Sequence, residues 1–205
     1  MPMSWSPDGK LLVYWTNDPK TAGDIWALPL TGEKKPVVIL QTTADERHPQ
    51  VSPDGKWIAY SSNETGRSEI YIKSFPEGPA KIQVSVNGGV FPRWRHDGKE
   101  LYFMSLVSLG NLMASDIRVA GPSVQRDVPR VLFQSVFANG AHAGQYHAYA
   151  VSANGQRFLI PQYETPPALY AAGVVARGRG ATLVTLLPAV IADRHAATAP
   201  ASCRR

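Results

Sequence analysis

Three aspartates recur along the chain, each directly before a glycine: Asp8, Asp54 and Asp97. Carboxylate oxygens are ligands for hard cations such as calcium. A calcium ion needs several oxygens that converge on one point, and single aspartates separated by 46 and 43 residues do not supply them. An aspartate beside a turn glycine commonly caps a β-turn through hydrogen bonds to backbone N–H groups. We therefore predict that these aspartates shape turns, and that the chain holds no metal ion or other cofactor.

Histidines are the second group of side chains that could do chemistry, as metal ligands or in proton transfer. His142 and His147 lie five residues apart beside two tyrosines, with no carboxylate near them in the sequence, and His48 directly precedes Pro49. We interpret all three as surface or packing residues. Cys203 is the one cysteine, so neither an internal disulfide nor a cysteine zinc motif can form.

The sequence motifs of phosphoryl transfer and of serine hydrolysis are missing. A kinase needs a glycine-rich loop, a strand lysine, a His-Arg-Asp loop and an Asp-Phe-Gly motif, and none of these occurs. A serine hydrolase of the α/β class needs a Gly-x-Ser-x-Gly elbow, which is also missing. We predict that the chain is not an enzyme, and that any kinase or peptidase activity would lie in sequence outside it.

The charge of the chain gives little support for nucleic-acid binding. The formal net charge is +5, but residues 164–205 hold five arginines against two carboxylates, which gives +3 and leaves +2 for the first 163 residues. No run of basic residues interleaved with aromatic ones occurs there, as a nucleic-acid surface would need. We predict a protein or small-molecule partner and no nucleic acid.

The aspartates belong to a repeat that must position every other group. Ser-Pro-Asp-Gly-Lys at 6–10 returns at 52–56, more loosely as Arg-His-Asp-Gly-Lys at 95–99, and as Ser-Ala-Asn-Gly-Gln at 152–156. The steps between the Asp or Asn positions are 46, 43 and 57 residues, and the first two match the period of four-stranded propeller blades. Apolar runs follow each motif, which is typical of strands covered on both faces.

The chemistry of the repeated motif is that of a tight turn between two strands. Proline presets φ at the first central position, aspartate or asparagine accepts backbone hydrogen bonds, and glycine takes a positive φ. The residues predicted to form these turns are Pro7, Asp8, Gly9, Pro53, Asp54, Gly55, Asp97, Gly98, Asn154 and Gly155.

These patterns predict an all-β fold, a partial β-propeller of about three and a half four-stranded antiparallel blades. The predicted blades cover residues 1–162, at about 4–43, 47–86, 90–134 and 146–162. Residues 105–110 interrupt the third repeat, so we expect that blade to be irregular. Residues 163–205 are rich in alanine and arginine and show no strand alternation, which predicts a divergent, disordered or weakly helical tail.

The repeat resembles a known family. An aromatic residue or valine, Ser-Pro-Asp-Gly-Lys, an apolar strand and then Asp/Glu-Ile-aromatic is similar to the TolB-type, WD-like propeller repeat over about residues 4–160. Residues 91–160, with Phe-Pro-Arg-Trp at 91–94 and Gly-Gln-Arg-Phe-Leu-Ile at 155–160, resemble the propeller end that follows the kinase domain of many bacterial serine/threonine protein kinases. This resemblance implies a non-catalytic sensing or protein-interaction module, part of such a kinase-like protein.

Two alternative functions stay open. One is a TolB-like propeller that binds envelope proteins, and the other is a remnant of the propeller of a prolyl-oligopeptidase-like enzyme. A membrane-anchored kinase or a TolB-like protein would place the propeller in an extracytoplasmic or periplasmic compartment.

Loops carried by a rigid scaffold are the usual places where propellers bind partners. The tryptophans repeat with the blades, except Trp15, whose equivalents are Ser61 and Met104. Since three and a half blades do not close a ring, we also expect open blade edges and faces to favour self-association. The residues predicted for partner binding are Trp15, Asn17, Asp18, Glu64, Arg67 and Arg93.

Overall fold

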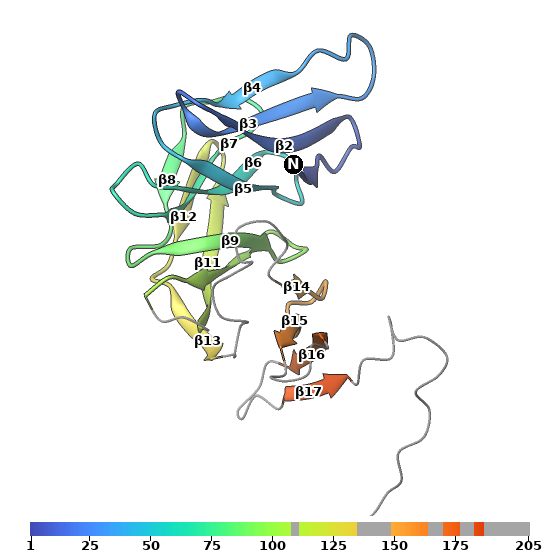
Figure 1. The fold of residues 1–205 in the computed structure, drawn as a ribbon, viewed down its shortest axis with the longest axis vertical. Helices are drawn as coiled ribbons and strands as arrows, with labels where there is room; N and C mark the ends of the chain where they lie inside the picture. The colour runs from blue at the N-terminus through green and yellow to red at the C-terminus, as the bar shows by residue number, and fades with distance from the viewer. Residues whose placement is uncertain (108–110, 135–148, 164–169, 177–182, 187–205) are drawn as a thin grey trace, which may run out of the picture.

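A computed structural model describes residues 1–107, 111–134, 149–163, 170–176 and 183–186. Four antiparallel sheets follow one another along the chain, and sequential strands pair in each, with one additional strand in the third (Figure 1). The predicted all-β fold of four-stranded antiparallel blades is confirmed. No helix that could cross a membrane occurs in the described ranges.

The first two sheets are regular, with four strands each in sequential order. Each begins with an inner strand, makes the repeated turn, and continues through two further strands to a short outer one. The first sheet consists of β1 (Pro2–Trp5), β2 (Leu11–Asp18), β3 (Ala22–Pro29) and β4 (Val37–Leu40). The second consists of β5 (Glu46–Val51), β6 (Trp57–Ser62), β7 (Glu69–Ser74) and β8 (Lys81–Gln83).

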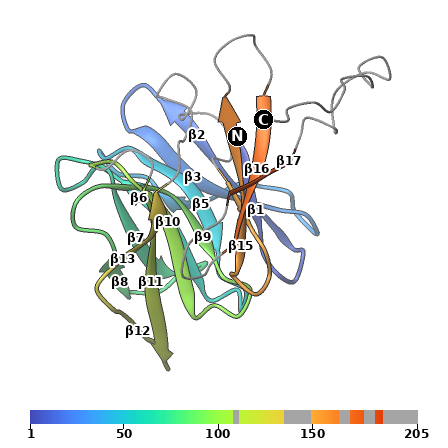
Figure 2. The same cartoon turned by 90° about the horizontal axis from the view of Figure 1, so that it is seen from below.

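The third sheet carries an additional strand. Its strands are β9 (Gly89–Trp94), β10 (Glu100–Ser105), β11 (Asn111–Ala120), β12 (Ser123–Arg126) and β13 (Arg130–Gln134). The first part of β11 pairs with β13 and its last part with β12, so a hairpin reaches past the other strands of this sheet (Figure 2). Arg126 on this hairpin donates from Nε to the carbonyl of Gln83 in the second sheet at 3.1 Å. The third blade is therefore irregular, because the end of β11 forms a hairpin with β12.

The fourth sheet is complete, which corrects two predictions. It consists of β14 (Ala150–Val151), β15 (Arg157–Tyr163), β16 (Tyr170–Ala176) and β17 (Leu183–Leu186). The half blade is thus a full one, and the prediction of a strand-free tail is wrong at β16 and β17. Four of the seven residues 170–176 are alanine or glycine, which have weak strand propensity. Pairing with β15 over its full length, from Arg157↔Ala176 to Tyr163↔Tyr170, supplies the backbone hydrogen bonds.

Neighbouring sheets pack face to face through equivalent positions of the second strand of each blade. In blades two to four, Ile58, Leu101 and Phe158 are buried against the preceding sheet. The position two residues later is also buried in each of these blades. Three apolar clusters therefore fill the three junctions between four consecutive sheets. In the first blade the equivalent residues, Leu12 and Tyr14, are only half-buried.

Candidate functional site

The first two repeated turns have the hydrogen bonds that their sequence predicts. Ser6 Oγ donates to Asp8 Oδ1 at 2.6 Å, and the backbone N–H groups of Lys10 and Leu11 donate to Asp8 Oδ1 and Ser6 Oγ at 3.1 and 2.9 Å. The Ser52–Asp54 turn repeats this pattern atom for atom. The hydrogen bond from Ser6 lowers the pKa of Asp8 below its usual value.

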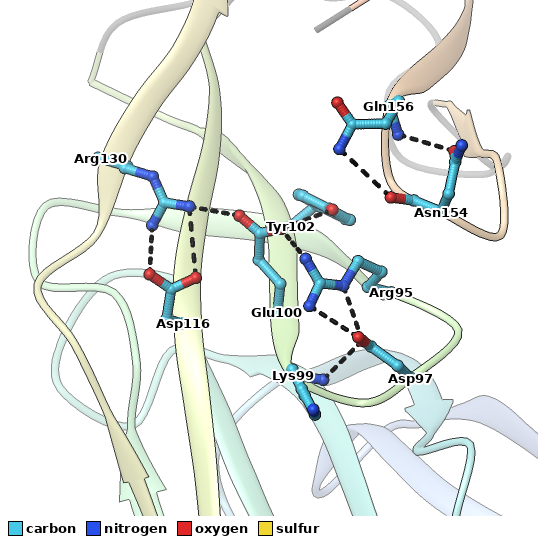
Figure 3. A network of polar contacts seen from close by, with 9 residues as sticks. All are labelled: Arg95, Asp97, Lys99, Glu100, Tyr102, Asp116, Arg130, Asn154 and Gln156. Carbon is cyan, nitrogen blue, oxygen red and sulfur yellow. Dashed lines mark hydrogen bonds and ion pairs between the residues drawn. The ribbon is translucent and has the colours of Figure 1, made fainter.

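The third turn replaces the serine by Arg95. Its guanidinium donates to Asp97 from Nε and Nη2 at 2.7 Å each, and this contact lowers the pKa of Asp97 (Figure 3). Arg95 also donates from Nη1 to the buried carboxylate of Glu100 at 3.1 Å. Glu100 further accepts hydrogen bonds from Tyr102 and from Arg130. The carboxylates of this turn are therefore balanced by arginines of the same sheet.

The fourth turn uses asparagine in the same role. Ser152 Oγ donates to Asn154 Oδ1 at 2.8 Å, and the backbone N–H of Gln156 donates to the same oxygen at 3.1 Å. In all four turns the glycine has a φ near +70°, a conformation that L side chains rarely adopt. Asp8, Asp54 and Asp97 each accept a backbone hydrogen bond within their own turn, as the turn interpretation predicts. In the described ranges no group of three or more His, Cys, Asp or Glu side chains could hold a metal ion.

The ends of the four inner strands surround one cavity, here called the funnel. Its volume is about 590 Å³, within the size range of small-ligand sites. Each of the four sheets contributes to it the residues just before or within its repeated turn. The funnel is lined by Trp5, Pro7, Gln50, Val51, Ser52, Pro53, Arg93, Trp94, His96, Val151, Ser152 and Ala153.

Hydrogen bonds between the inner strands hold the funnel wall in shape. Gln50 Nε2 donates to the carbonyl of Met3 at 2.9 Å, and Ser4 Oγ accepts from the backbone N–H of Val51 at 3.1 Å. On the other side, Trp94 Nε1 donates to the carbonyl of Gln50 at 3.1 Å. The first three inner strands are therefore linked directly to one another around the cavity.

Arg93 is the predicted partner-binding residue that the structure places in the funnel. It is the one Lys or Arg in the funnel lining, which contains no Asp or Glu. Burial lowers the pKa of Arg93, and the nearby Tyr149 opposes this shift. The guanidinium therefore stands in a partly desolvated position, where a positive charge interacts strongly with an anion.

Deeper along the inner strands, two residues have backbone conformations that the sequence did not reveal. His48 and Phe91 both have a φ of +56° and both precede a proline at a bulge. Their rings lie 4.1 Å apart between centroids, and His48 Nδ1 lies 2.9 Å from Ser61 Oγ. His48 is thus a buried packing residue, as interpreted above, whereas His142 and His147 lie outside the described residues.

The other predicted partner-binding residues lie at the opposite ends of the strands. Arg47 stacks over the Trp15 ring at 4.6 Å and reaches Asn17 Oδ1 at 3.5 Å. Asp18 accepts a hydrogen bond from the backbone N–H of Lys20 at 2.8 Å. The contacts of Arg47 tie the β2–β3 hairpin to the start of the second blade, whereas that of Asp18 lies within the hairpin.

Glu64 and Arg67 lie in the equivalent hairpin of the second blade. Glu64 forms an ion pair with Lys81, and Arg67 forms one with the buried Glu69. Arg67 also donates to the carbonyl of Val86 at 2.7 Å. The structure therefore does not bring these residues together with Arg93, and it uses their charges in contacts within the blade.

The remaining funnel residues were not predicted as a site. Trp5, Val51, Trp94 and Val151 hold the same position in the four repeats. Val51 and Trp94 are buried, whereas Trp5 is 60% exposed and Val151 is half-buried. Their shared position in the repeat could have predicted that they line one cavity, because equivalent residues of successive blades lie around one axis.

Comparisons of the sequence give two relatives. No protein-family model matches the chain. Tricorn protease homolog 1 of Streptomyces coelicolor is 30% identical over 105 residues, covering 46% of this chain and 8% of that protein. An uncharacterized protein of Agrobacterium fabrum is 30% identical over 104 residues, covering 49% of this chain and 34% of that protein. The chain therefore spans a minor part of each relative.

Solved structures agree at the level of the fold. TolB from Acinetobacter baumannii has a TM-score of 0.60 at 17% identity, over 84% of this chain and 39% of that one. The tricorn protease also has a TM-score of 0.60, at 14% identity, over 92% of this chain and 22% of that one. The kinase-linked version of the resemblance stays a prediction, because these likenesses do not bear on it. The four sheets and these likenesses together show that the chain has a TolB-like and tricorn-like β-propeller fold.

Proposed function

We propose that the chain is a non-catalytic β-propeller binding module, and that the funnel is its site for a protein or peptide partner. The observation that supports this most directly is that all four sheets contribute to the one cavity. A site built from several blades holds its groups at fixed distances, which reduces the ordering that binding requires.

The funnel is a better candidate than the hairpins at the opposite ends of the strands. There, Trp15, Glu64 and Arg67 already have partners within the chain. A partner that bound these residues would have to compete with contacts within the chain, and one of those contacts includes the buried Glu69. The funnel instead offers Trp, Pro and His side chains together with the half-buried Arg93.

A peptide library tests the proposal. Ala153→Trp places a bulky ring in the funnel, and Thr16→Trp places the same ring at the exposed far end of β2 as a matched control. We expect displayed random peptides selected on the wild-type protein to lose at least tenfold in affinity for Ala153→Trp and to bind Thr16→Trp unchanged. A selection that yields no binder, or binders indifferent to Ala153→Trp, would contradict a funnel site.

The kind of larger protein to which this module belongs is a separate question. A TolB-like envelope propeller and the propeller part of a peptidase are both supported by the likenesses above, and the tricorn protease homolog favours the second. The kinase-linked sensor rests on sequence resemblance alone. The coding sequence on both sides of this chain discriminates between these alternatives. A peptidase domain in the same frame supports the peptidase propeller, and a kinase domain supports the kinase-linked sensor.

A further inference from the structure

We infer that the funnel takes a carboxylate of a peptide or protein partner, either an acidic side chain or a chain terminus, through the guanidinium of Arg93. This inference rests on the proposed function and names the chemistry that the site would recognise. It is carried by the position of Arg93 in a cavity to which all four sheets contribute and whose lining contains no carboxylate.

The geometry of a guanidinium suits this role. Arginine offers five N–H donors in a planar fork that matches the two oxygens of a carboxylate. Arg93 takes part in further contacts within the chain, and five donors allow it to bind a ligand as well.

The environment of Arg93 strengthens its interaction with an anion. It lines the funnel together with Trp94, Pro7 and Pro53, and burial lowers its pKa. A charge–charge contact is worth more where water is excluded than at an open surface. A carboxylate entering the funnel would therefore bind more strongly than the same group at an exposed arginine.

The lining also indicates the kind of molecule that carries the carboxylate. Nucleic acids are bound through many Lys and Arg side chains that neutralise successive phosphates, whereas the funnel has one. Trp5, Trp94, Pro7 and Pro53 provide apolar surface around that single charge. One carboxylate with an apolar side chain next to it fits this arrangement, and a peptide supplies both.

The test uses four tetrapeptides and the tryptophan indole signals of the full chain labelled with nitrogen-15. The peptides are acetyl-Gly-Leu-Phe-Glu and acetyl-Gly-Leu-Phe-Gln, each with a free or an amidated C-terminus. Trp5 and Trp94 line the funnel and report binding, and Trp26 on β3 is an internal control outside it. The Glu–Gln and acid–amide pairs separate a side-chain carboxylate from a terminal one.

We expect at least one carboxylate peptide to shift the Trp94 signal with an affinity at least tenfold higher than the fully neutral peptide. Arg93→Gln should remove this preference, and Arg93→Lys should reduce it several-fold because the forked geometry is lost. Arg118→Gln makes the same charge change on the projecting hairpin and should leave the preference intact. The indole spectrum also reports whether each variant is folded. If Arg93→Gln does not fold, Arg93→Lys tests the inference in its place.

The outcomes separate this inference from the proposed function. If the four peptides bind equally, or if Arg93→Gln keeps the preference, the inference is wrong, while funnel binders from the peptide library would still support the binding module. If Arg118→Gln removes the preference as well, the attraction comes from the net charge of the chain and not from Arg93. If no peptide shifts Trp94 and the library yields no funnel binder, both proposals fail.

Discussion

Glu100 is a fully buried carboxylate whose neighbours compensate its charge. Arg95 and Arg130 form ion pairs with it, and Tyr102 donates to its Oε2 at 2.8 Å (Figure 3). Arg95 and Arg130 keep ion pairs with Asp97 and Asp116 when Glu100 is removed, so the loss is that of the hydrogen bonds to the buried carboxylate, about 1–3 kcal/mol. We expect Glu100→Ala to lower the free energy of unfolding by this amount in urea denaturation.

Asp127 provides the control for that experiment. It pairs with Arg118 on the exposed hairpin, and the side chains are 41% and 64% exposed. Exposed pairs contribute about 0–1 kcal/mol. Asp127→Ala should therefore change the stability by less than 1 kcal/mol, and a similar loss for both variants would show that burial of Glu100 is not the cause.

Glu46 makes stability depend on pH. Burial raises the pKa of Glu46, and the nearby Asp24 adds to the effect, while Oε2 is buried without a hydrogen-bond partner. Because the raised pKa belongs to the folded state, the stabilisation from the bound proton is full below the usual glutamate pKa and is lost as pH rises through the raised value. We expect Glu46→Gln to be more stable than wild type at pH 8, with a difference that shrinks toward pH 4 in urea denaturation. A difference that does not change with pH would contradict this account.

At the scale of elements, the repeated turns also pack blade against blade. A Cβ on Gly55 would lie 3.3 Å from Pro7 of the preceding turn, and one on Gly98 would lie 3.8 Å from Pro53. A Cβ on Gly155 would lie 2.1 Å from the Tyr102 hydroxyl and 2.8 Å from Arg95, whereas one on Gly9 would meet nothing within 4 Å. The same turn therefore has a different neighbour in each blade.

Alanine substitutions at these glycines separate backbone strain from contact between blades. All four sites have nearly the same positive φ, so each variant should lose about 1–2 kcal/mol from backbone strain alone. We expect Gly9→Ala to show only this loss, Gly55→Ala a somewhat larger one, and Gly155→Ala the largest, measured by urea denaturation. Equal losses at Gly9 and Gly155 would mean that the fourth turn does not press on the third blade.

At the scale of the whole molecule, one face of the first sheet is not covered by any other sheet in the described part of the chain. Ile58 and Tyr60 of the second blade are fully buried by the first, but the equivalent Leu12 and Tyr14 are only half-buried, because none of the described sheets packs on them. Exposed apolar faces of this kind favour association. We expect wild-type protein to sediment faster as its concentration rises, and Tyr14→Lys to weaken this association about tenfold.

Val128→Lys is the matched control for that measurement, since Val128 is 79% exposed between β12 and β13. Its association should equal that of the wild type. Sedimentation of the wild type as a single species at every concentration would contradict association through the open face of the first blade.

The turns and the strands next to them were predictable because their information is local. Pro7, Asp8 and Gly9 specify a turn by their own φ preferences and hydrogen bonds, and the three later turns repeat that arrangement. β16 was not predictable in this way, because alanine and glycine carry little strand propensity and the strand exists through its pairing with β15. Arg93 was predicted as a binding residue, but its neighbours in the funnel come from four separate repeats.

The sequence by itself determined the repeat, the four turns and the all-β class, since each follows from residues adjacent in the chain. Only the tertiary structure decided which residues share a site. It placed the ends of four inner strands around one cavity and left Glu64 and Arg67 at the far ends of their strands, in ion pairs of their own. The physical reason is that packing between blades, and not spacing along the chain, sets the distances between residues more than 40 positions apart.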